Sequence, residues 1–158
     1  MKTKRNWSIL VLVLATMAFG LVPVSAPAQS AGKDFVMVKS LQSYSATVDS
    51  LQRSIKSNGL MVMGNVNQKA ILSMTGLKLE GAESFLVGNP RVGKELFGIN
   101  PAVASVIPSR ISVWADHGTT YVGYFKPSAM LGMISSQLVN SGTMLDEKFE
   151  KIVQEATK

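Results

Sequence analysis

Apolar residues along the chain change their spacing several times, and each change predicts a new element of secondary structure. Residues 35–38 form a short apolar run typical of a strand. Residues 44–58 carry apolar side chains at helical spacing, with Gly59 just beyond the end. Residues 60–66 return to a strand pattern, and a short helix is expected over about 68–75. The first half of the chain is thus predicted to alternate between strands and helices.

In the middle of the chain, the residue pattern predicts a strand, a helix and an irregular stretch. Residues 84–87 read as a brief apolar strand that ends at the Gly-Asn-Pro turn at 88–90. Proline cannot donate to a sheet, and glycine and asparagine favour turns, so the strand is expected to stop there. A short helix over 91–98 should follow, and then an irregular or briefly helical stretch between Pro101 and Pro108.

A β-hairpin is the strongest pairing signal in the sequence. Apolar and polar side chains alternate over residues 110–115, and residues 120–125 are expected to form a second strand that pairs with them. Asp116-His117-Gly118 supplies the turn between them. We therefore expect two adjacent antiparallel strands in this region.

Two helices are predicted after the hairpin. The first begins at Pro127 and is expected to end at Asn140 and Gly142. The last helix is expected over 143–157, with Thr143 opening a motif that resembles a capping box. One face of this last helix should pack on the sheet through an apolar stripe, formed by Leu145, Phe149, Ile152 and Val153.

The first 28 residues have the features of a secretory signal peptide. A basic start at residues 2–5 precedes a nearly wholly apolar run over 9–24, and Ala26-Pro27-Ala28 offers the small residues that a signal peptidase recognises. An uncleaved membrane anchor is the alternative, but this apolar run is short against the roughly 20 residues that a spanning helix needs. We predict cleavage after Ala28 and a place in a bacterial periplasm or outside the cell.

The remaining residues, 29–158, fit one small domain that can bury a core without disulfides or metals. Removal of the signal peptide takes three of the 16 basic residues and none of the 10 acidic ones, which lowers the net charge from +6 to +3. The other cations are scattered singly among acids, so nucleic acid is not an expected partner. No membrane insertion is expected after cleavage, because no later apolar run approaches a spanning length.

The chain contains few of the residue types that build catalytic or metal sites. The chain has no cysteine and one histidine, His117, so a zinc site of His and Cys ligands or a Cys-His pair cannot be assembled. Asp116, His117 and Glu83 could contribute to a hydrolytic site, but turn geometry explains the first two better. We expect no cofactor and no metal, and a hydrolase is the last of the alternatives considered.

Several short runs resemble one known family in their order and spacing. They are Phe-Leu-Val-Gly-Asn-Pro at 85–90, Ile-Pro-Ser-Arg at 107–110 before a strand, the strand segment 121–124 and Pro127. Together they resemble the family catalogued as domain of unknown function 302, over a core of about residues 48–131.

The resemblance implies an α+β fold: a two-layer sandwich similar to the TATA-binding-protein-like folds, in which helices pack on one face of an antiparallel sheet. It also implies a tendency to form homodimers. Members commonly carry an Asp-His pair after the second strand, where this chain has Asn67-Gln68. Lys126 stands where Asp or Asn is common. Any chemistry that depends on those groups is therefore not expected here.

The Gly-Asn-Pro turn is the candidate site, and it allows two interpretations. Asn89 can simply cap a helix that Pro90 begins. The turn can also present free amides to an anion, with Arg91, Lys94 and Arg110 close enough in sequence order to converge on a carboxylate or phosphate. The predicted ligand-binding residues are Asn89, Arg91 and Arg110 as polar anchors and Trp114 and Tyr124 as apolar contacts.

These observations favour an exported, non-catalytic binding or assembly module for a small anionic molecule. A structural homodimer of the cell envelope is the main alternative. The sequence names neither the ligand nor a reaction.

Overall fold

The computed structural model describes residues 32–158, so the predicted signal peptide over 1–28 lies outside the described residues. Five strands, five α-helices and two 3₁₀ turns follow one another within them. In chain order they are β1 (Phe35–Lys39), α1 (Tyr44–Ser57), β2 (Met61–Asn67), α2 (Gln68–Ser73), β3 (Gly81–Gly88), α3 (Pro90–Ile99), η1 (Pro101–Ser105), β4 (Ser109–Asp116), β5 (Thr119–Phe125), α4 (Pro127–Ile134), η2 (Ser136–Leu138) and α5 (Val139–Ala156).

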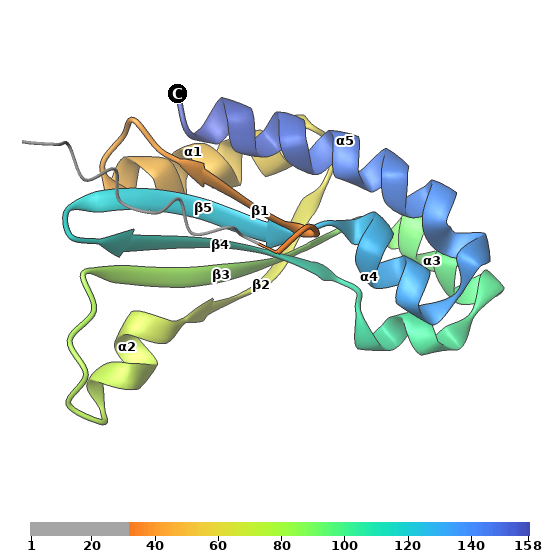
Figure 1. The fold of residues 1–158 in the computed structure, drawn as a ribbon, viewed down its shortest axis with the longest axis horizontal. Coiled ribbons are helices and arrows are strands. Elements are labelled where there is room, and N and C mark those ends of the chain that lie inside the picture. Colours follow the sequence, from red (N-terminus) through yellow and green to blue (C-terminus); the bar gives the residue numbers. More distant parts are fainter. Residues whose placement is uncertain (1–31) are drawn as a thin grey trace, which may run out of the picture.

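The strands form a single antiparallel sheet in the order β1-β5-β4-β3-β2 (Figure 1). β4 and β5 are the predicted hairpin, joined by a tight turn in which His117 and Gly118 have φ values of 48° and 72°. Positive φ at both central residues is typical of a type I′ turn, whose twist matches that of the strands. The predicted α+β class with an antiparallel sheet and packed helices is confirmed.

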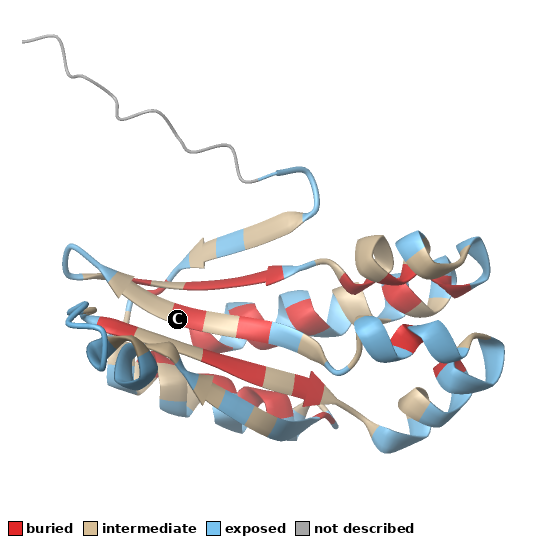
Figure 2. Ribbon diagram, turned by 90° about the horizontal axis from the view of Figure 1, so that it is seen from below, coloured by how far each residue is buried: buried red, intermediate tan, exposed pale blue. Residues whose placement is uncertain are grey.

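The main core lies between one face of the sheet and the helices α1 and α5, which run side by side (Figure 1). Side chains alternate between the two faces of a strand, so every second residue of β3, β4 and β5 enters this core. Figure 2 shows the resulting alternation of buried and less buried positions along the central strands. The fully buried members with the largest side chains include Phe85, Ile111, Leu51, Ile55 and Phe149.

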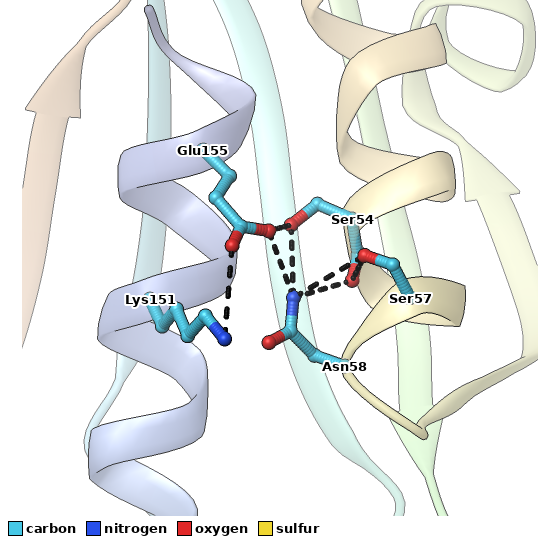
Figure 3. Close-up of polar contacts among 5 residues, drawn as sticks. All are labelled: Ser54, Ser57, Asn58, Lys151 and Glu155. Atoms are coloured by element: carbon cyan, nitrogen blue, oxygen red, sulfur yellow. Dashed lines mark hydrogen bonds and ion pairs between the residues drawn. The ribbon is translucent and has the colours of Figure 1, made fainter.

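Polar contacts also join the two covering helices. The carboxylate of Glu155 on α5 accepts hydrogen bonds from Ser54 Oγ and from Asn58 Nδ2 at 2.8 Å, both at the end of α1 (Figure 3). Lys151 lies 3.9 Å from the same carboxylate. The hydrogen bonds from Ser54 and Asn58, in that order of effect, lower the pKa of Glu155 below its ordinary value.

The boundary between the last two helices differs from the prediction. α4 ends at Ile134 and α5 already begins at Val139, so Asn140 and Gly142 lie inside a helix, and the predicted start at Thr143 is wrong. The Thr143 hydroxyl donates to the carbonyl of Val139 within the helix instead of capping it. Tertiary packing overrides the local stop signals, because α4 and α5 cross closely at Gly142.

Asp146 of α5 caps the start of α4. Lys126, the residue before α4, makes no side-chain capping bond. Asp146 supplies one from outside, since its carboxylate accepts from the Ser128 amide at 2.9 Å and from the Ser128 hydroxyl. The two helices are thereby fixed at the end of the sheet, with a second cluster of buried side chains around Leu96 and Leu131.

The short helix α2 lies on the other side of the sheet from α1 and α5 (Figure 1). Gln68 Nε2 donates to Ser84 Oγ at 2.6 Å, and Ser84 Oγ meets Ser112 Oγ at 2.8 Å. These serines alternate with Phe85 and Ile111 of the core, so they point to the opposite face. The expectation that helices cover one face alone therefore holds for α1 and α5 but not for α2.

Candidate functional site

A cavity of about 390 Å³ opens where α3, the end of β3 and the middle of α5 meet. Four of its lining side chains are buried: Leu60, Val87, Leu96 and Phe149. Met63 and Phe97, which are about half exposed, also line it. The cavity is thus lined by buried apolar side chains and opens to solvent beside the flexible Met63 and the aromatic Phe97.

The Gly-Asn-Pro turn forms one wall of this cavity. Asn89 Oδ1 accepts from the Arg91 amide at 2.9 Å, which makes Asn89 the N-cap of α3, and Pro90 occupies the first turn. Asn89 Nδ2 donates to the carbonyl of Gly59 at 3.0 Å. Both ends of the Asn89 amide are therefore used by the protein, and the capping interpretation of this turn is confirmed.

Gly88 lies close to Met63 of β2 and to Pro108 in the segment before β4. A Cβ at Gly88 would lie 3.0 Å from Met63 Sδ and 3.5 Å from Pro108 Cβ. An alanine here would therefore require the flexible Met63 side chain to shift by a few tenths of an ångström, while the contact with Pro108 would be an ordinary one.

Lys94 is the charged residue of the cavity lining. It is exposed on α3, and among residues 32–158 it takes part in no ion pair. A positive charge beside an apolar floor favours a ligand that combines an apolar body with an acidic group.

A second cavity, of about 380 Å³, lies on the other face of the sheet. Val87 of β3 lines the first cavity and its neighbour Leu86 lines the second, and adjacent residues of a strand point to opposite faces. Residues 107–109 line both cavities and form the wall between them. Arg110 is the charged residue of the second lining.

The five predicted site residues do not come together in the structure. Asn89 lines the first cavity, Arg110 lines the second, and Arg91 is exposed on α3 outside both linings. Trp114 stacks on Tyr121, with ring centroids 5.6 Å apart, on the face away from the core. Tyr124 points to the core face.

Tyr124 is a core residue that packs edge-on against Phe149 at 5.4 Å between ring centroids. Burial, helped by the nearby charges of Glu150 and Asp146, raises the pKa of Tyr124 to about 12. Its hydroxyl is thus held neutral, and Phe149 lines the first cavity whereas Tyr124 does not.

Sequence reasoning singled out Lys94 but not the apolar lining around it. Val92, Leu96 and Phe97 on α3 follow helical spacing and could have been recognised as an amphipathic face. The contribution of Leu145 and Phe149 had no local signal, because these residues come from a helix about 50 positions later in the chain.

The residues of the hydrolytic alternative are also separated by the fold. Asp116 and His117 form a 2.8 Å contact at the tip of the hairpin, where the His117 side chain is 94% exposed. Glu83 lies within β3, where its carboxylate accepts from Asn67 Nδ2 at 3.1 Å. Within residues 32–158, no group of three or more His, Asp or Glu side chains is placed to hold a metal ion.

Asn67 and Gln68 have structural partners at the place where the resemblance implies Asp and His. Asn67 caps α2 by accepting from the Ala70 amide at 2.8 Å, and Gln68 joins α2 to Ser84. In the part of the chain that the structure describes, no helix is long and apolar enough to cross a membrane.

Comparison with known proteins agrees with this fold. The family model described as "Domain of unknown function DUF302" matches residues 36–156. The crystal structure of an uncharacterized conserved DUF302 protein from Bacillus stearothermophilus is similar, with a TM-score of 0.74 and 20% sequence identity over 80% of this chain and 99% of that one. At this identity the likeness concerns the fold. A comparison with curated proteins found no match. The chain, whose sheet, helices and Gly-Asn-Pro turn were described above, belongs to the DUF302 family.

Proposed function

We propose that this domain is a binding module for a small amphipathic organic acid. The apolar body of the ligand would occupy the cavity beneath α3, and its acidic group would lie beside Lys94. The observation that carries the proposal is a 390 Å³ cavity whose lining combines buried apolar side chains with one cation, Lys94, that forms no ion pair within the described part of the chain. Sites of this size and character are typical of small-molecule binding.

The proposal predicts binding rather than turnover. A general acid or base has to lie within hydrogen-bond reach of the reacting group; the lining contains no Asp, Glu or His, and we assign its one charged group, Lys94, to holding the acid of the ligand. The role we propose is therefore to hold or deliver the ligand, in the periplasm or outside the cell if the signal peptide is cleaved as predicted.

Octanoate and 1-octanol form a matched pair of probes, because they share the apolar chain and differ in charge. We expect both to bind, with octanoate tighter, as measured by isothermal titration calorimetry. Lys94→Gln should weaken octanoate by about 3- to 5-fold, the effect of losing an exposed ion pair, and leave 1-octanol unchanged.

Gly93→Leu tests the location of the chain-binding space. Gly93 lines the cavity, and a Cβ there meets no atom within 4 Å, so a leucine can enter the cavity without displacing the backbone. Gly98→Leu is the control, because Gly98 lies on the same helix with equally open surroundings but outside the lining. Unchanged binding of both probes by Gly93→Leu would place the site elsewhere and refute the proposal.

Homodimer formation is the second candidate function. It is supported by the apolar character of the sheet face away from α1 and α5, where Met37 and Phe125 are 40% and 57% exposed. Native mass spectrometry of the full-length protein expressed with its N-terminus and purified from the periplasm distinguishes the candidates in one spectrum. A monomer with a retained organic acid supports the binding module, whereas a dimer without an adduct supports assembly. The same mass reports whether residues 1–28 have been removed.

A further inference from the structure

The second cavity combines an apolar wall with a guanidinium group. Leu86, Phe125 and Met130 supply the larger apolar side chains, and Arg110 is the charged group of the lining. Arg110 pairs with Leu86 across β3 and β4, so both side chains rise from the same face of the sheet. The apolar side chain of Leu86 and the cation of Arg110 are therefore neighbours in the lining of the same cavity.

Arg110 is free to bind a ligand. Its side chain is exposed, and it forms no ion pair within the described residues 32–158. A guanidinium presents paired N–H donors at the spacing of the two oxygens of a carboxylate, and such bidentate contacts are among the stronger polar interactions at a protein surface. The chemistry of this group therefore favours a carboxylate.

Phe125 gives the site an aromatic wall in a defined orientation. Phe125 is 57% exposed, and its ring centroid lies 5.0 Å from that of Phe35 on the neighbouring strand β1, at an interplanar angle of 53°. A ring held by a partner on the sheet can stack against an aromatic ligand without losing much freedom. Met130, also in the lining, has a flexible side chain that can adapt to the shape of the ligand.

We infer that this second cavity is a separate binding site for an aromatic carboxylate, whose acid group pairs with Arg110 and whose ring lies against Phe125. The site lies on the opposite face of the sheet from the Lys94 cavity, with residues 107–109 between them. It does not depend on the function proposed for the first cavity, and each cation serves as the control for the other site.

The test uses 2-naphthoate as probe and 2-naphthamide as its uncharged counterpart, with binding followed by NMR shifts of the full mature domain. We expect 2-naphthoate to shift the signals of Leu86, Ala104 and Met130. Arg110→Gln should weaken it by about 5-fold or more, and Arg110→Lys by less, because lysine keeps the charge but not the paired donors. Lys94→Gln should have no effect on 2-naphthoate, and Arg110→Gln none on 2-naphthamide.

Three outcomes would overturn the inference. Shifts confined to the Lys94 cavity would place the aromatic acid in the first site. If the unaltered domain and Arg110→Gln bind 2-naphthoate with equal affinity, the guanidinium does not take part in binding. Arg110-dependent binding of 2-naphthyl phosphate without binding of 2-naphthoate would identify a phosphate site instead. Octanoate binding, measured in the same variants, reports on the function proposed above. Arg110→Gln should leave the octanoate affinity unchanged, so the two proposals can fail independently.

Discussion

The crossing of α4 and α5 rests on one glycine, and replacing it gives the sharpest test of the fold. An ideal Cβ at Gly142 would lie 2.3 Å from Ser128 Cα and 2.8 Å from Ser128 N. These are backbone atoms of a buried contact, so no side chain can rotate away to make room. For the nearest pair to reach an ordinary contact of 3.4 Å, the two helices must separate by about 1 Å.

The expected magnitude for Gly142→Ala follows from opposing terms. Overpacking of a well-packed contact costs about 1–3 kcal/mol. The separation also stretches the hydrogen bonds of Asp146 to Ser128, worth about 1 kcal/mol. Alanine improves the intrinsic helix propensity by about 1 kcal/mol. We therefore expect Gly142→Ala to lower the free energy of unfolding by about 1–3 kcal/mol.

Gly98→Ala is the matched control for this measurement. Gly98 also lies in a helix, but a Cβ there meets no atom within 4 Å, so only the propensity term applies. Urea denaturation of the two variants should give changes of opposite sign, with Gly98→Ala stabilised by about 0.5–1 kcal/mol. If Gly142→Ala is as stable as Gly98→Ala, the close approach of the helices is not what requires glycine at this position.

Two further substitutions probe polar contacts. Because its folded-state pKa is lowered, Glu155 contributes stability that is present above its unfolded pKa and is lost as the pH falls through the lowered value. Glu155→Gln should therefore be less stable than the unaltered protein in urea at pH 7, and the difference should shrink toward pH 3; a difference independent of pH would contradict the linkage. Asn89→Ala should lower the free energy of unfolding by about 1–2 kcal/mol, because it removes the cap of α3 and the bond to Gly59. Asn89→Asp keeps the acceptor for the cap, so it should recover part of the loss by the same assay, and no recovery would argue against the cap.

Most strands and helices could be predicted because their signals are local. The turn at His117-Gly118 has residues that accept positive φ, and the apolar spacing of α1 repeats over several turns. β3 is longer than the apolar run at 84–87, since Gly81 pairs with Ala115 under the ring of Tyr44. That contact joins residues almost 40 positions apart, and no pattern within the strand itself could have indicated it.

At Gly142, too, a contact between distant residues decides the structure, and here it overrides a local signal that predicts the end of a helix. By local preference Asn and Gly end a helix, and the prediction of an end at Asn140 and Gly142 followed that preference. The helix continues because Gly142 permits a contact with Ser128 that a side chain would prevent, and because Asp146 one turn later caps the partner helix. A glycine that looks like a stop signal can therefore be a packing residue, and only the position of α4 distinguishes the two.

The candidate sites depend on the fold more strongly than the elements do. Sequence order suggested that Lys94 and Arg110 would converge on one anion, and the turn at 88–90 supported that hypothesis. The segment 107–109 passes between them, however, so each cation lines its own cavity on its own face of the sheet. Residue types thus led to the hypothesis of an acidic ligand, whereas the path of one short segment places each cation in its own cavity beside its own apolar wall.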